Sequence, residues 1–309
     1  MAERDQRTLP LSFRAGARVR GVASQAGGVT LLAGVAGALL LPDHLVSDRL
    51  ALGLGFVGFL LLMLGTILTI VPRGPRLAPR AVAPPVRGRW VAVNSPASGV
   101  PSHGTHGHGQ TFAIDLVYEP ALGTRPAFGS GAAFRPAQDF PGFGQEILAP
   151  ADGRVVAVRQ SAPDHRSRSN RPAGAYMLLE GAVRELGGSR FLLGNYVVLD
   201  LGDGAYATLA HLQRGSVAVR PGQLVRQGDV LARCGNSGNS SEPHLHFQLA
   251  DHQLAFVAAG LPFVFTGVRL EGAEGTVAGD GVPANEQAMV APSPEFRVPS
   301  FELNAVLER

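Results

Sequence analysis

The chain has 309 residues, and its 27 basic residues are all arginine, since it contains no lysine. Its single cysteine, Cys234, excludes an internal disulfide. The formal net charge is only +3, and no run of basic residues is interleaved with aromatic ones, which argues against a nucleic-acid partner.

The N-terminal quarter of the chain is apolar rather than globular. Residues 1–21 are rich in arginine, and residues 22–71 contain two uncharged runs separated by a short polar loop. The second run, 51–71, is long enough to cross a bilayer, and 22–41 is a shorter candidate of the same kind. We therefore predict two transmembrane helices, with the lipid bilayer as their partner. A cleaved signal peptide is the alternative for the first run, although no small-x-small cleavage site precedes Asp43.

The rest of the chain divides into a linker, a domain and a tail. Residues 72–89 are rich in proline and arginine, which favours an extended linker that holds the next domain away from the membrane. From 90 to 265, short apolar runs alternate with Gly, Pro and Asp turns, without a convincing long amphipathic helix, so this domain is predicted to be mainly β. Within it, 121–143 and 164–188 are typical of inserted loops. Periodicity is lost after residue 265, which predicts a partly disordered tail over 266–309.

The most informative motif is the stretch 236–248, N-S-G-N-S-S-E-P-H-L-H-F-Q. A cluster of turn-forming residues leads there into a short strand. Side chains alternate along a strand, so His244 and His246 point to the same face of the sheet. Two imidazoles placed in this way can share a metal ion or serve one reaction. A solvent-facing pair of histidines is the alternative.

Further segments upstream complete a family pattern. They are A-P-A-D-G-R-V-V-A-V at 149–158, N-Y-V-V-L-D at 195–200, Y-A-T-L-A-H-L at 206–212 and V-R-P-G-Q-L-V-R-Q-G-D-V-L at 219–231. In this order, and followed by the His-x-His motif, they resemble the lysostaphin-type, or LytM-type, zinc metallopeptidases, which are peptidoglycan endopeptidases. The resemblance covers roughly residues 90–265. It implies a compact antiparallel β-sheet of the duplicated hybrid motif type, with one zinc ion at the floor of a groove.

The resemblance also implies the zinc ligands. In this family a histidine, an aspartate and the second histidine of His-x-His hold the metal, which places Asp115 and His246 in the ligand set. The first ligand departs from the common pattern, because Thr111 stands four residues before the aspartate. Three histidines lie further back, in P-S-H-G-T-H-G-H-G. We expect His103 to be the ligand; His106, His108 and a glycine-rich loop without any ligand are the alternatives.

Two other histidines match the family's catalytic positions. His211 ends the strand before the His-x-His motif, and His244 is the first histidine of that motif. The resemblance implies that both act on a zinc-bound water and on the transition state. The chain contains neither an H-E-x-x-H helix nor a G-x-S-x-G elbow, so zincin and serine-hydrolase chemistry are not indicated.

These expectations combine into a membrane-anchored zinc metalloendopeptidase that hydrolyses cross-links or stem peptides of bacterial peptidoglycan. The catalytic domain is expected on the outer side of the cell membrane. Arginines flank both predicted spans on the domain's side, however, and the positive-inside rule would place that side in the cytoplasm. An inverted hairpin, a single span and a substrate other than the wall remain open.

Two other classes of function are alternatives. One is a catalytically silent relative that binds wall peptides or regulates another hydrolase. The other is a phosphocarrier domain of the sugar-transport kind, which shares the broader fold and uses two histidines. Such a carrier would have no use for Asp115 or for zinc.

Overall fold

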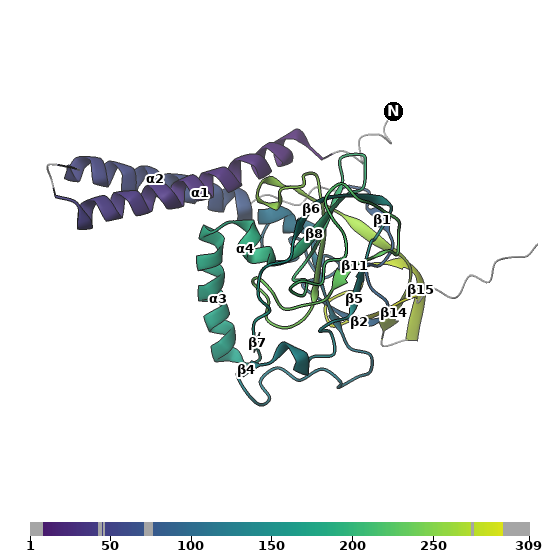
Figure 1. Ribbon diagram of the computed structural model, residues 1–309. Helices are drawn as coiled ribbons and strands as arrows, with labels where there is room; N and C mark the ends of the chain where they lie inside the picture. Colours follow the sequence, from purple (N-terminus) through teal and green to yellow (C-terminus); the bar gives the residue numbers. More distant parts are fainter. Residues whose placement is uncertain (1–8, 43–44, 46, 71–76, 273–274, 293–309) are drawn as a thin grey trace, which may run out of the picture.

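A helical hairpin projects from a β domain, and a shorter helix lies beside the base of the hairpin (Figure 1). The computed structural model describes residues 9–42, 45, 47–70, 77–272 and 275–292. The mainly β character of the domain and the two N-terminal helices agree with the expectation from the sequence. The part of the expected tail beyond residue 292 lies outside the described residues.

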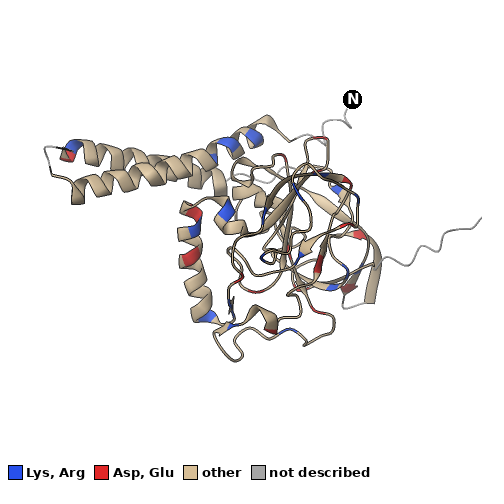
Figure 2. Ribbon diagram, viewed as in Figure 1, with Lys and Arg blue, Asp and Glu red and all other residues tan. Residues whose placement is uncertain are grey.

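The hairpin consists of α1 (Leu11–Leu40) and α2 (Asp48–Ile70). Both helices are long and apolar enough to cross a membrane by length and composition. Glycines let their backbones approach closely: a Cβ added at Gly34 or Gly58 would overlap the backbone of the facing helix. Figure 2 shows that the charged residues of the hairpin gather beside the domain and at the tip.

The first turns of α1 are fastened to the β domain by ion pairs. Arg14 Nε and Arg18 Nη2 lie 3.1 and 3.0 Å from the Asp251 carboxylate, and Arg20 donates to the carbonyl of Ala258 at 2.9 Å. These arginines therefore have partners within the protein. Their presence beside the first predicted span is explained by packing against the domain as well as by the orientation of that span in the membrane.

An apolar cluster extends the same contact. Phe13 and Ala17 of α1 are buried with Ala259 of the domain, and the backbone N–H of His106 donates to the carbonyl of Thr69 in α2 at 3.0 Å. The start of α1 therefore contacts the domain directly, through an apolar stripe and through the arginines that bind Asp251.

The domain is built on a 12-stranded sheet with the path β1-β14-β16-β2-β3-β12-β9-β8-β6-β10; β13 pairs with β12, and β15 with β14. Among the described strands, β1 and β14 pair in parallel and the other pairs are antiparallel. The strands are β1 (Arg80–Val82), β2 (Gly88–Val93), β3 (Ile114–Tyr118), β6 (Gly153–Arg159), β8 (Tyr196–Asp200), β9 (Tyr206–Ala210), β10 (Leu224–Val225), β12 (Leu245–Ala250), β13 (Gly260–Leu261), β14 (Phe263–Gly272), β15 (Gly275–Gly281) and β16 (Ala288–Ala291).

Smaller elements surround this sheet. Two strand pairs stand apart from it, β5 (Glu146–Leu148) with β11 (Val230–Arg233) and β4 (Phe134–Arg135) with β7 (Ser167–Arg168). The remaining helices are α3 (Arg171–Leu186), α4 (Ser189–Leu193) and the 3-10 turns η2 (Gly107–Phe112), η3 (Ala137–Asp139) and η4 (Ala255–Val257).

The sheet extends beyond the expected domain boundaries at both ends. Part of the expected linker forms β1, and the start of the expected tail forms most of β14 and all of β15 and β16. The core requires these strands, because Phe247 of β12 packs against Phe263 and Phe265 at ring distances of 4.9 and 5.6 Å. Burying one such ring contributes about 1.5–3 kcal/mol. Glycines interrupt the apolar pattern of β14 and β15, so the sequence does not reveal these strands.

The second inserted stretch, expected to be a loop, contains the helix α3. Asn170 caps it by accepting a hydrogen bond from the Ala173 N–H at 3.0 Å, and Pro172 occupies its first turn. Both features are standard helix-start signals. The helix was missed because its apolar residues do not face the core of the domain.

Candidate metal centre and active site

Three side chains converge at the centre of the sheet. Asp115 in β3 and His246 in β12 are direct cross-strand partners, and the loop before η2 brings His103 over them. His103 Nε2 lies 3.0 Å from Asp115 Oδ2, and His246 Nδ1 lies 2.9 Å from Asp115 Oδ1. One ligand atom from each residue lies within 4.8 Å of the others, which is the spacing of a metal site.

The tautomer of His246 follows from its neighbours. Gln248, two residues along the same strand face, donates its amide N–H to the His108 carbonyl at 2.9 Å. Its oxygen Oε1 therefore faces His246 Nε2, at 2.9 Å, and accepts a hydrogen bond from the Nε2–H group. Nδ1 of His246 is left with a lone pair directed at the cluster.

His103 is oriented in the same way by the adjacent Ser102. The Ser102 hydroxyl donates its one proton to the Ala113 carbonyl at 2.7 Å, so it accepts from His103 Nδ1 at 3.1 Å. Nε2 of His103 then presents a lone pair toward Asp115. Outer hydrogen bonds of this kind are what fix metal-ligating histidines in proteins.

The donor set fits a divalent cation. With both outer nitrogens protonated, the inner nitrogens of His103 and His246 face a carboxylate with no proton between them. A cation bound between them would offset the electrostatic repulsion between the imidazole lone pairs and the carboxylate. Burial opposes ionisation of Asp115, but when no cation is bound the positive charges of protonated His103 and His244 outweigh it and hold the pKa of the carboxyl well below its usual range. Asn94 donates to Asp115 Oδ2 at 2.9 Å and fixes its orientation.

The two remaining histidines lie beside this cluster. The rings of His211 and His244 are 4.7 Å apart, and His211 is 5.7 Å from His246. His211 has a φ of 60°, an uncommon conformation for a residue with a side chain, and such strain clusters at functional sites. Its Nδ1 lies 2.8 Å from the Ser237 carbonyl, and His244 Nδ1 lies 2.7 Å from the Glu242 carbonyl.

The two side chains differ in their proton affinity. Burial, followed by the proximity of His244 and His246, lowers the pKa of His211 well below its usual range. Burial acts in the same direction on His244, but Asp115 and the Glu242 carbonyl overcome it, so the pKa of His244 is raised.

The other two loop histidines point away from the cluster. His106 is fully buried, where its ring meets Phe13 of α1 edge-on and Nδ1 lies 3.0 Å from Thr111 Oγ1. His108 pairs with Glu185 of α3 at 2.8 Å. The structure thus brings His103, and neither of the others, to Asp115 and His246.

We expect His103→Ala to abolish tight zinc binding, because it removes one of three ligands. His106→Ala and His108→Ala are the matched controls and should keep full occupancy, since their rings contact Phe13 and Glu185 instead. The measurement is zinc content per chain after dialysis against a weak chelator. Loss of zinc in His106→Ala or His108→Ala, with retention in His103→Ala, would contradict this assignment.

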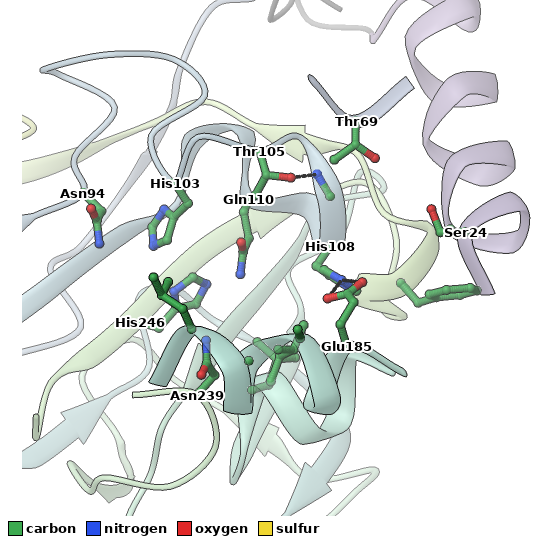
Figure 3. A pocket seen from close by; sticks show the side chains of 18 of the residues that line it. Ser24, Thr69, Asn94, His103, Thr105, His108, Gln110, Glu185, Asn239 and His246 are labelled. Carbon is green, nitrogen blue, oxygen red and sulfur yellow. Dashed lines mark hydrogen bonds and ion pairs between the residues drawn. The ribbon is translucent and has the colours of Figure 1, made fainter. Parts of the chain in front are cut away.

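A cavity of about 680 Å³ leads from the histidines to the helices (Figure 3). Figure 3 shows His103 and His246 at one end, Ser24 of α1 at the other, and His108 with Glu185 between them. The hairpin and α3 both contribute to its wall, through Ser24, Leu62, Thr66, Met177, Leu178 and Gly181.

Three residues that orient the cluster were not found from the sequence. Gln248 could have been, because it stands two residues after His246 and so lies on the same face of the strand. Ser102 directly precedes His103, but nothing in the sequence marks its hydroxyl as an acceptor. Asn94 is 21 residues from Asp115 and reaches it only through sheet pairing.

Residues 134–256 match the model of peptidase family M23. The matched segment contains His211, His244 and His246, while His103 and Asp115 precede it. This part of the chain is thus similar to peptidase family M23, as the resemblance to the lysostaphin or LytM type implies.

Several solved structures align with about half of the chain. The catalytic domain of lysostaphin from Staphylococcus simulans has 17% identity and a TM-score of 0.28, over 49% of this chain and 77% of its own. A zinc-containing peptidase from Vibrio cholerae has 18% identity and a TM-score of 0.25, over 48% of this chain and 45% of its own. The deep-sea M23 metalloprotease pseudoalterin has 15% identity and a TM-score of 0.29, over 56% and 70%.

Proposed function

We propose that this protein is a membrane-anchored zinc metalloendopeptidase that hydrolyses cross-links or stem peptides of bacterial peptidoglycan. The observation that carries the proposal is the convergence of His103, Asp115 and His246, each oriented by an outer hydrogen bond, beside two histidines that are not needed as ligands. The match of residues 134–256 to peptidase family M23 supports hydrolysis of a peptide bond.

His103 Nε2, Asp115 and His246 Nδ1 would hold the metal. A zinc ion bound there supplies a Lewis acid for the scissile carbonyl and a water whose pKa is lowered toward neutrality.

The protein's own groups complete the chemistry. Because a carbonyl can only accept a hydrogen bond, Nδ1 of His211 carries a proton that it donates to Ser237. Its Nε2 is then free to take a proton from the attacking water. His244 is likewise fixed by the Glu242 carbonyl, and its Nε2 lies 3.5 Å from Asp115 Oδ1. From there it can donate to the developing oxyanion or to the leaving amine.

The silent relative and the phosphocarrier are less well supported alternatives. Silent relatives typically lose a ligand or a catalytic histidine, whereas this chain has a suitable residue at each of the five proposed positions. A phosphocarrier would not need the carboxylate of Asp115 between two imidazoles.

The direct test is cleavage of purified sacculi by the detergent-solubilised full chain, loaded with zinc. We expect new amino groups to be released and the activity to disappear with a chelator and return with zinc. Full zinc occupancy without cleavage of any wall substrate would favour the silent relative or a substrate outside the wall.

A further inference from the structure

Helix α3 has its polar and apolar faces reversed relative to a helix that packs on a protein core. Its outward residues follow helical spacing and are almost all apolar: Tyr176, Leu178, Leu179, Val183 and Leu186 are 51–72% exposed. Its charged residues Glu180 and Arg184 point inward instead, whereas the half-exposed Glu185 pairs with His108, and Leu178 at the edge of the stripe also lines the cavity. A helix in a soluble protein ordinarily buries its apolar stripe, so this exposed stripe indicates a binding surface for an apolar partner.

The inward face is held by ion pairs rather than by apolar packing. Glu180 binds Arg168 of β7 and Arg184 of its own helix, the latter at 2.6 Å. Arg184 also donates to the Phe191 carbonyl at 3.2 Å. These contacts fix the rotation of α3 and hold its apolar stripe outward.

The position of α3 identifies the partner. The helix lies on the side of the domain from which the hairpin projects, and it runs across the hairpin axis (Figure 1). Its last residue, Leu186, lies 3.7 Å from the position of a Cβ at Gly28, where the apolar part of α1 begins. The stripe is thus continuous with the lipid-exposed surface expected for the hairpin, whose residues such as Val29 and Phe56 are also exposed.

Helix length supports the same partner. Beyond Gly28, the stretch 28–40 of α1 rises only about 20 Å at roughly 1.5 Å per residue. The hydrocarbon core of a bilayer is about 30 Å thick. The difference between the thickness of the hydrocarbon core and the length of this helical stretch matches the depth to which interfacial helices insert, about 5–10 Å. A hairpin that spans the bilayer therefore places α3 within the membrane interface.

We propose that α3 is an interfacial membrane-binding helix, which inserts its stripe of Tyr176, Leu178, Leu179, Val183 and Leu186 into the bilayer beside the hairpin. The lipid surface is the occupant of this face, and the domain lies directly on the membrane. The inference rests on the membrane anchoring included in the proposed function, and not on the peptidase activity.

The test is the depth of single nitroxide labels in the full chain, reconstituted in vesicles of equimolar phosphatidylcholine and phosphatidylglycerol. Leu178→Cys and Val183→Cys report on α3. Val277→Cys is the matched control, because Val277 in β15 is as exposed as Leu178, at 72%. Phe56→Cys reports on the hairpin, and native Cys234 is fully buried and should stay unlabelled.

We expect the ratio of oxygen accessibility to nickel-complex accessibility to be severalfold higher at 178 and 183 than at 277, with an inferred depth of about 5–10 Å. A water-like ratio at 178 with a lipid-like ratio at 56 would overturn the inference and leave the anchor intact. Water-like ratios at both positions would overturn the anchor as well. Spin–spin broadening at 178 that magnetic dilution removes would identify a second copy of the chain as the occupant, and would also overturn it.

Discussion

Asp115→Ala and His246→Ala should each abolish tight zinc binding. One ligand atom from each of the three proposed ligands lies within 4.8 Å of the others, so they would share one ion, and removal of any one should leave a site that holds zinc only weakly. Zinc content per chain, measured after dialysis of the zinc-loaded protein, gives the result directly. His252→Ala is the control, because this histidine lies outside the cluster and accepts a hydrogen bond from its own loop.

The same experiment can test a residue that orients a proposed ligand without being a ligand itself. Gln248→Ala leaves all three ligands in place but removes the acceptor for His246 Nε2, so zinc affinity should fall by about 10–100-fold rather than disappear. Circular dichroism establishes whether each variant keeps its β domain. Full zinc occupancy in a folded His246→Ala protein would refute the ligand set.

The sequence predicted those features that local patterns encode. The composition of an uncharged run such as 51–71 alone predicts a long apolar helix. The observed bounds of α2 differ from this run by less than about one helical turn. The alternation around His246 likewise predicted β12, although that strand begins at Leu245 and His244 directly precedes it. Here the residue types and the period of the element carry the same information, so a single segment suffices.

Features that depend on packing between distant segments were not predictable in this way. The boundary at 265 was wrong because β14 is defined by its pairing with β1, β15 and β16, and not by a continuous apolar pattern. Helix α3 was missed because an apolar stripe is normally assigned to a core, whereas this one faces outward. The loop that carries His103 closes over Asp115 through η2, whose His108 has a φ of 52° that its sequence does not announce.

Variants of His211 and His244 distinguish metal binding from catalysis. Neither belongs to the group of three candidate ligands, and each has Nδ1 fixed by a backbone carbonyl, at 2.8 and 2.7 Å. We therefore expect His211→Ala and His244→Ala to retain zinc and fold, yet to lose about 10²-fold or more in hydrolysis of wall peptides, as is usual for an acid–base or oxyanion partner.

The measurement pairs release of new amino groups from sacculi with zinc quantification on the same samples. His252→Ala again serves as the control and should cleave at the rate of the unmodified chain, because its side chain bonds only within its own loop. Loss of both zinc and activity in His211→Ala would make that residue a ligand and not a proton-transfer group. Retention of near-normal cleavage by both variants would overturn the mechanism, since the reaction would then proceed without the two imidazoles that the sheet places beside the metal ligands. Loss of activity with zinc retained in both is the outcome that the fixed tautomers of His211 and His244 require.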